Sequence, residues 1–153
     1  MKFDIKDNTV IPSMDRFKKF GIFQDLQAEM KAAYEINEKM NLAYHSLWQN
    51  VKKLSGGNQQ KIVIAKWMLR DTEIFLLDEP TRGIDVGAKY EIYDLIIQMA
   101  KQGKTIIVVS SEMPEILGIT NRIGVMSNGR LAGIVNTKET NQEELLRLSA
   151  KYL

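Results

Sequence analysis

The sequence contains no cysteine, a single histidine and three prolines, and its charges nearly cancel. The absence of cysteine excludes a disulfide scaffold, a thiolate metal site and a cysteine nucleophile, and is typical of a reducing compartment. Lysine and arginine number 21 against 19 acidic residues, a formal net charge of +2. That charge is too weak for the basic surface that nucleic acids require, so no nucleic-acid partner is predicted.

Long hydrophobic runs are also missing, so no segment is predicted to span a bilayer, and the amino-terminal region lacks the apolar core of a signal peptide. If the protein acts at a membrane, other subunits must therefore cross that membrane. With 153 residues, 44% hydrophobic and 26% charged, the chain has the composition of one ordinary globular domain.

The amino-terminal third is predicted to be helical. Apolar residues recur at every third or fourth position from Gln24 to about Asn50, which is the pattern of one face of a helix or of a pair of helices. Residues 1–13 mix single apolar residues with Asp, Lys and Asn, and no element is predicted there. We expect helices between about residues 15 and 69 to pack beside a sheet.

The middle of the chain follows the pattern of an α/β fold. Gly56 and Gly57 are interpreted as a break before the next helix. The expected elements are then a short helix, a fully buried strand, a helix that stops at Gly103 and a second buried strand, at residues 60–69, 74–77, 88–101 and 105–109. Buried strands alternating with amphipathic helices predict a mostly parallel sheet, with function at the carboxyl ends of its strands.

The carboxyl-terminal part is predicted to contain a short helix, a hairpin and a final helix. The short helix begins near Pro114 and ends near Gly118. Asn128-Gly129, between apolar runs at 123–126 and 131–135, indicates a tight β-hairpin. Asn141, three residues before Glu144, is typical of a helix start.

Two carboxylates follow the first predicted strand, Asp78 and Glu79. At such an edge Asp78 could hold Mg²⁺, and Glu79 could polarise a water molecule for attack on a phosphate. Taken alone, the pair is more often a solvated acidic turn.

A glycine-containing segment, Leu54-Ser55-Gly56-Gly57-Asn58-Gln59-Gln60-Lys61, precedes the acidic pair, with Gly57 21 residues before Asp78. Glycine amides, the Ser55 hydroxyl and the amino end of the next helix together could bind phosphate. A Gly-Gly loop capped by Ser55 is the simpler alternative, but its combination with the acidic pair is much less common.

These motifs resemble those of ABC-type ATPases. Leu-Ser-Gly-Gly-Asn-Gln is similar to the family's signature motif, and the strand ending in Leu-Asp-Glu-Pro-Thr to its Walker B strand. Gly83-Ile84-Asp85 resembles the D-loop, and Val109-Ser110-Ser111-Glu112 stands at the switch strand. Motif residues of the family occur throughout about residues 54 to 153. Before residue 54 no motif is present, and that segment is assigned only by its position in the chain.

The resemblance implies part of a P-loop NTPase core with a helical subdomain at about 15–69, and the Walker B, D-loop and switch part at about 70–153. It implies ATP and Mg²⁺ as cofactors. The residues it assigns to nucleotide binding are Ser55, Gly56, Gly57, Asn58, Gln59 and Asp85, with Asp78 at the metal, and Glu79 and Ser111 at the catalytic positions.

Two departures from the family pattern qualify this assignment. The family's phosphate loop is Gly-x-x-x-x-Gly-Lys-[Ser/Thr], and Gly103-Lys104-Thr105 fails because Gln98 replaces the first glycine. The resemblance therefore implies the carboxyl-terminal part of a nucleotide-binding domain, which alone would hydrolyse little ATP. Ser111 also replaces the family's usual histidine and cannot carry positive charge, so a weak hydrolytic site is expected here.

The particular residues of these motifs are similar to those in the second half of tandem ATPase subunits from bacterial sugar importers of ribose/galactose type. The similarity is greatest to the galactose/methyl-galactoside members. This implies coupling of ATP hydrolysis to import of a monosaccharide, with the signature completing the partner half's site. The implied partners are that second nucleotide-binding half, transmembrane permease subunits and, indirectly, a periplasmic sugar-binding protein. The implied location is the cytoplasmic face of the inner membrane, as a peripheral subunit.

Two alternatives remain open from the sequence. An ABC ATPase of translation or DNA repair shares these motifs, but translation relatives tend to have Asn-His-Leu-Asp where this chain has Arg82-Gly83-Ile84-Asp85. A non-catalytic assembly or regulatory remnant of the fold is supported by the missing phosphate loop and by Ser111.

Overall fold

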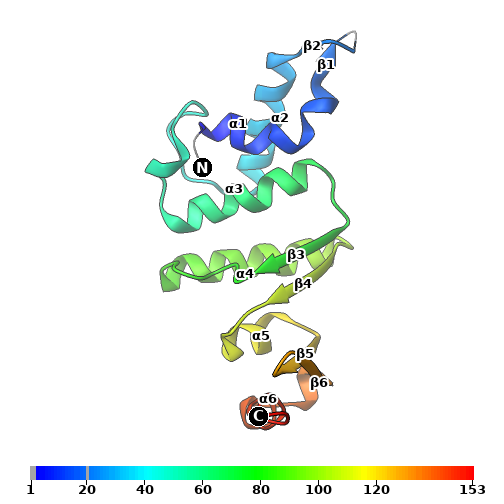
Figure 1. The fold of residues 1–153 in the computed structure, drawn as a ribbon. Helices are drawn as coiled ribbons and strands as arrows, with labels where there is room; N and C mark the ends of the chain where they lie inside the picture. Colours follow the sequence, from blue (N-terminus) through cyan, green and yellow to red (C-terminus); the bar gives the residue numbers. More distant parts are fainter. Residues whose placement is uncertain (1–2, 20) are drawn as a thin grey trace. The chain divides into compact units, whose positions relative to one another are not determined.

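The computed structural model describes residues 3–19 and 21–153, which form a mixed α/β fold (Figure 1). The chain packs as two compact units. The first, which we call the helical unit, contains the chain up to Phe75 and Thr81–Ile106; the second, the hairpin unit, contains Leu76–Pro80 and Ile107–Leu153. The predicted boundary near residue 70 divides the chain by family subdomain rather than by packing, so it stays a prediction.

The helices are α1 (Ile5–Val10), α2 (Leu26–Lys39), α3 (Gly56–Leu69), α4 (Val86–Lys101), α5 (Met113–Ile119) and α6 (Gln142–Ser149), with 3₁₀ segments η1 (Ile11–Phe17), η2 (Val51–Lys53) and η3 (Thr137–Glu139). The strands are β1 (Lys18–Lys19), β2 (Phe23–Gln24), β3 (Ile74–Asp78), β4 (Thr105–Val109), β5 (Arg122–Ser127) and β6 (Arg130–Asn136). Among the described residues no helix is both long and apolar enough to cross a membrane.

In the helical unit, α1, α2 and α3 lie side by side (Figure 1). Their core contains Ile5, Leu42, Val51 and Ile62, all buried. Burial of each such side chain away from water contributes about 1.5–3 kcal/mol to the stability of the fold. Helix α1 lies in the stretch for which no element was predicted, and Asp4 caps it by accepting a hydrogen bond from the Asp7 backbone N–H (2.8 Å).

Two sequence-based boundaries in this unit are wrong. The region from Gln24 to about Asn50, expected to form one helix or a pair, contains a single α-helix that ends at Lys39, because Asn41 adopts a left-handed backbone conformation (φ 47°) and the chain turns away there. Gly56 and Gly57 are not a break but the first turn of α3, after the N-cap residue Ser55. Glycine weakens a helix less at this position, since first-turn N–H groups have no partner within the helix.

Strands β3 and β4 pair in parallel, as predicted. The Thr105 N–H donates to the Glu73 carbonyl (2.9 Å), and at the other end the Glu79 N–H donates to the Val109 carbonyl (2.8 Å). The expectation of a fully buried first strand and a buried second strand is wrong, and in β4 Ile107 and Val109 are 50% and 57% exposed. Ile74 and Leu76 are 59% and 74% exposed, whereas Phe75 is buried, because successive side chains point to opposite faces.

The hairpin unit has its own core of Ile123, Val125 and Leu145, in which α6 packs against β5 and β6. The antiparallel hairpin forms as predicted, and Asn128 and Gly129 take the positive φ values that a tight turn requires (45° and 75°). The predicted helix start at Asn141 is also confirmed.

A buried ion pair joins α1 to α2. The Lys6 ammonium lies 3.0 Å from the Glu29 carboxylate and 2.8 Å from that of Asp7. Burial lowers the pKa of Lys6. Its hydrogen bonds to the carboxylates of Asp7 and Glu29 together raise the pKa by a larger amount, so the pKa lies above its ordinary value. Glu29 is only 1% exposed, and Gln24 Nε2 donates a second hydrogen bond to its carboxylate.

We expect Lys6→Met to lower the free energy of unfolding by about 3 kcal/mol, because it leaves the Glu29 carboxylate buried without its cation. Urea denaturation measures this loss. The double variant Lys6→Met/Glu29→Leu should recover much of it, and Lys52→Met, at an exposed lysine, is the matched control. Equal losses in the single and double variants would contradict the ion-pair explanation.

Candidate functional site

Ser55 caps the amino end of α3 and is exposed. Its hydroxyl oxygen accepts hydrogen bonds from the Asn58 backbone N–H (3.4 Å) and from the Asn58 side-chain Nδ2 (3.0 Å). A serine hydroxyl has two acceptor positions and one proton. With both acceptor positions used, what Ser55 can offer an anion is its proton.

The side chains of Asn58 and Gln59 turn back onto the protein backbone. Asn58 Oδ1 accepts from the Ala43 N–H (3.1 Å), and Gln59 Nε2 donates to the Leu54 carbonyl (2.9 Å). Both side chains therefore brace the chain that leads into α3. Their predicted role at a nucleotide stays a prediction.

Gly57 brings the amino end of α3 directly against α4. A Cβ atom placed on Gly57 would lie 2.6 Å from the Cβ of Ala88, closer than real Cβ atoms approach one another. A Cβ on Gly56 would have ordinary contact with the Gly83 carbonyl (3.7 Å). The predicted signature segment and the predicted D-loop are thus neighbours within the helical unit.

Asp85 ends the predicted D-loop and caps α4. Its Oδ1 accepts from the Ala88 N–H (2.9 Å), and the turn before it is closed by the Ile84 N–H and the Thr81 carbonyl (3.2 Å). Asp85 is thus the N-cap residue of α4, a position where aspartate is strongly preferred. Its predicted role in nucleotide binding stays a prediction.

Lys61 was not singled out from the sequence, yet it connects three segments around this site. Its buried ammonium forms an ion pair with Glu91 of α4 (2.7 Å) and donates to the Asn41 carbonyl after α2 (2.8 Å). A lysine on an amphipathic helix usually lies in solvent, so only the packing distinguishes this one.

In the hairpin unit, the structure brings Glu79 and Ser111 together. Glu79 Oε1 accepts from the Ser111 backbone N–H (2.9 Å). Glu79 also adopts a left-handed conformation (φ 46°), which is uncommon for a residue with a side chain and is enriched at functional sites. The contact that Ser111 makes here comes from its backbone and does not depend on its side chain.

Asp78 is exposed at the end of β3. No group of three or more metal-ligating side chains occurs within residues 3–19 and 21–153. Mg²⁺ commonly takes one or two carboxylates and completes its shell with water and phosphate oxygens. Asp78 therefore fits a shared Mg²⁺–phosphate site, and that assignment stays a prediction.

The rejection of Gly103-Lys104-Thr105 as a phosphate loop is confirmed. Gly103 has a φ of 90° directly after α4, and β4 begins at Thr105. The Lys104 ammonium binds the Asp71 carboxylate (2.8 Å), a hydrogen bond that lowers the pKa of that carboxyl.

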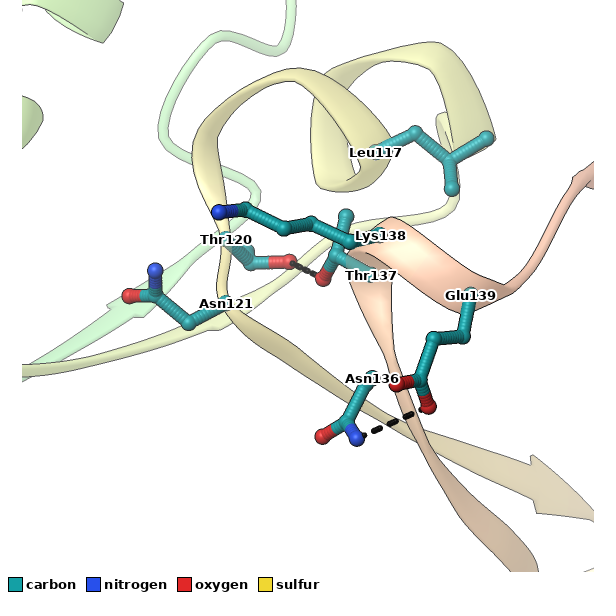
Figure 2. A pocket seen from close by; sticks show the side chains of 7 residues that line it. All are labelled: Leu117, Thr120, Asn121, Asn136, Thr137, Lys138 and Glu139. Carbon is teal, nitrogen blue, oxygen red and sulfur yellow. Dashed lines mark hydrogen bonds between the residues drawn. The ribbon is translucent and has the colours of Figure 1, made fainter.

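An open cavity of about 530 Å³ in the hairpin unit contains none of the predicted site residues (Figure 2). Hydrogen bonds join the Thr120 and Thr137 hydroxyls (3.1 Å) and Asn136 Nδ2 to Glu139 (3.0 Å) within its lining. Its lining residues are Leu117, Thr120, Asn121, Asn136, Thr137, Lys138 and Glu139.

Residues 3–82, just over half of the chain, match the family model described as ABC transporter. The chain therefore belongs to the ABC transporter family, as its motifs predicted. The match also covers the amino-terminal helical region, which sequence motifs assigned only by position.

Among curated proteins, the chain is 64% identical over 152 residues to the galactose/methyl galactoside import ATP-binding protein MglA of Treponema denticola, covering 99% of this chain and 30% of that protein. It is 54% identical over 151 residues to the protein of the same name from Fusobacterium nucleatum, covering 98% of this chain and 30% of that protein. The chain thus spans about three tenths of the length of the relatives it matches.

Solved structures share the fold. A metal-chelate type ABC transporter in an inward-facing conformation aligns with a TM-score of 0.82 at 21% identity, over 97% of this chain and 58% of that chain. A dimeric ATP-binding cassette in a post-hydrolysis state, bound to ADP and Pi, aligns with a TM-score of 0.71 at 24% identity, over 88% of this chain and 57% of that chain.

We expect Gly57→Ala to lower the free energy of unfolding by about 1–3 kcal/mol, because its methyl group overlaps Ala88 and forces α3 away from α4. Chemical denaturation of the four members of the double-mutant cycle with Ala88→Gly measures this. In the Ala88→Gly background, Gly57→Ala should lower the free energy of unfolding by much less.

Gly118→Ala is the matched control, since a Cβ atom there meets nothing within 4 Å. An equal cost of Gly57→Ala in both backgrounds would show that contact with Ala88 is not its cause.

Proposed function

We propose that this chain is part of the ATP-binding subunit of a bacterial sugar importer, which couples ATP binding and hydrolysis to entry of a monosaccharide. The observation that carries the proposal is the 64% identity with a galactose/methyl galactoside import ATP-binding protein over 99% of the chain. Galactose and methyl galactoside are accordingly the first sugars to test.

The amino end of α3 supports a role in binding the phosphates of ATP. The first N–H groups of a helix lack partners within it and carry partial positive charge, which favours an anion. Ser55 adds a hydroxyl proton, and Gly56 leaves the backbone accessible. In this proposal, Ser55 to Gln59 complete the ATP site of a partner nucleotide-binding half.

The chain's own acidic pair belongs to a second, weaker site in this proposal. Asp78 would hold Mg²⁺, and Mg²⁺ bound there supplies positive charge to the phosphates. Glu79 would orient the attacking water, with its carboxylate held by the Ser111 N–H. Serine at position 111 supplies no cationic side chain, so hydrolysis here is expected to be slow.

The remaining parts of the proposal concern the assembly. Residues at about 15–69 would form the helical subdomain and those at about 70–153 the Walker B and switch part of the core. The partners would be the second nucleotide-binding half, transmembrane permease subunits and, indirectly, a periplasmic sugar-binding protein. The subunit would then lie peripherally on the cytoplasmic face of the inner membrane. Asp85, which caps α4, would contact the partner half.

A second candidate function is a non-catalytic assembly or regulatory domain that keeps the fold without hydrolysing ATP. Serine at the switch position favours it. The same experiment separates the two candidates.

ATP turnover by the full transporter should respond in opposite ways to Ser55→Arg and Glu79→Gln. Ser55→Arg removes the hydroxyl donor and fills the amino end of α3, so turnover should fall by about a hundredfold. Glu79→Gln changes only the weaker site and should leave turnover nearly intact.

Gln102→Arg and Glu73→Gln introduce the same side chains at exposed positions and serve as controls. Loss of turnover with Glu79→Gln would show that this half hydrolyses ATP itself. Retention with Ser55→Arg would favour the non-catalytic candidate.

A further inference from the structure

A buried carboxylate on α5 plays no part in the proposed chemistry. Glu115 is 3% exposed. A carboxylate is costly to bury unless hydrogen bonds replace the water it loses. The Ser110 hydroxyl supplies one such bond, donating to Glu115 Oε2.

The bond to Glu115 determines the direction in which the Ser110 hydroxyl faces. A serine hydroxyl has one proton, and here that proton points to the Glu115 carboxylate. The hydroxyl oxygen is left as an acceptor and receives the Glu112 backbone N–H (3.0 Å). Glu115 and the turn of chain at 110–112 are therefore connected through one oriented hydroxyl group.

Ser111 lies between Ser110 and Glu112 in this turn, and its own N–H donates to Glu79 Oε1 (2.9 Å). Glu79 is held a second time, because its backbone N–H donates to the Val109 carbonyl (2.8 Å). A non-glycine residue at positive φ persists only where several contacts determine its conformation. These contacts all lie within the hairpin unit.

We infer that Glu115 is a positioning residue, which orients the Ser110 hydroxyl, holds the turn 110–112 and so directs the Ser111 N–H at the Glu79 carboxylate. The consequence for ATP turnover rests on the proposed function; the positioning itself does not. Since the donor to Glu79 is a backbone group, its direction depends on the conformation of the turn rather than on the side chain at position 111.

The test is amide hydrogen exchange and NMR on the full-length protein without nucleotide. Glu115→Ala and Ser110→Ala should each speed exchange of the Ser111 and Glu112 amides by about three- to tenfold, the equivalent of one hydrogen bond. Both variants should also shift the carboxyl ¹³C resonance of Glu79. Glu115→Gln, which still accepts from Ser110 but without a full charge, should give a smaller effect.

Amides of the β5–β6 hairpin separate positioning from a general loss of stability, because they should exchange at the parent rate in Glu115→Gln. Glu143→Gln, at an exposed acid of α6, is the control. Unchanged exchange at residues 111 and 112 and an unchanged Glu79 resonance in all three variants would overturn the inference. Equal acceleration throughout the hairpin would overturn it as well.

Turnover is measured separately on the same variants. Because Glu79 belongs to the weaker site in the proposed function, turnover should stay near the parent value even where exchange and the Glu79 resonance respond. If kcat instead falls at constant KM, the positioning role holds and the assignment of Glu79 to the weaker site in the proposed function fails.

Discussion

The close approach of α3 to α4 at Gly57 and Ala88 is the constraint on which the helical unit depends. The predicted signature segment opens α3, and the predicted D-loop opens α4, so the two loops take their positions from the contact between their helices. Any side chain at position 57 would separate them, since its Cβ would lie 2.6 Å from that of Ala88. The ion pair between Lys61 and Glu91 joins the same helices one turn further along.

Backbone N–H groups contribute to the predicted sites of both units. At the amino end of α3 the Gly56 and Gly57 N–H groups have no partner within the helix, whereas the Asn58 N–H donates to Ser55, whose two acceptor positions are both occupied. In the hairpin unit the Ser111 N–H holds Glu79, whatever side chain stands at position 111. The serine side chain therefore supplies no charge at this position, while the contact itself is made by the backbone.

Local patterns predicted much of the fold. Asn128-Gly129 predicted the hairpin, Asn141 the final helix and Gly103 the end of α4, because each depends on backbone preferences of a few neighbouring residues. The burial of β3 could not be predicted in this way. An apolar run shows that residues avoid water, but the exposed positions of Ile74 and Leu76 depend on what covers each face of the sheet.

The sequence by itself determined the motifs, their order and the family, because these depend on residue identity and spacing along the chain. Only the tertiary structure decided which atoms of those motifs already form hydrogen bonds within the protein. Asn58 binds Ala43, 15 residues away, and Glu79 binds Ser111, 32 residues away. Such hydrogen bonds form between segments that folding brings together, and local sequence preferences contain no information about them.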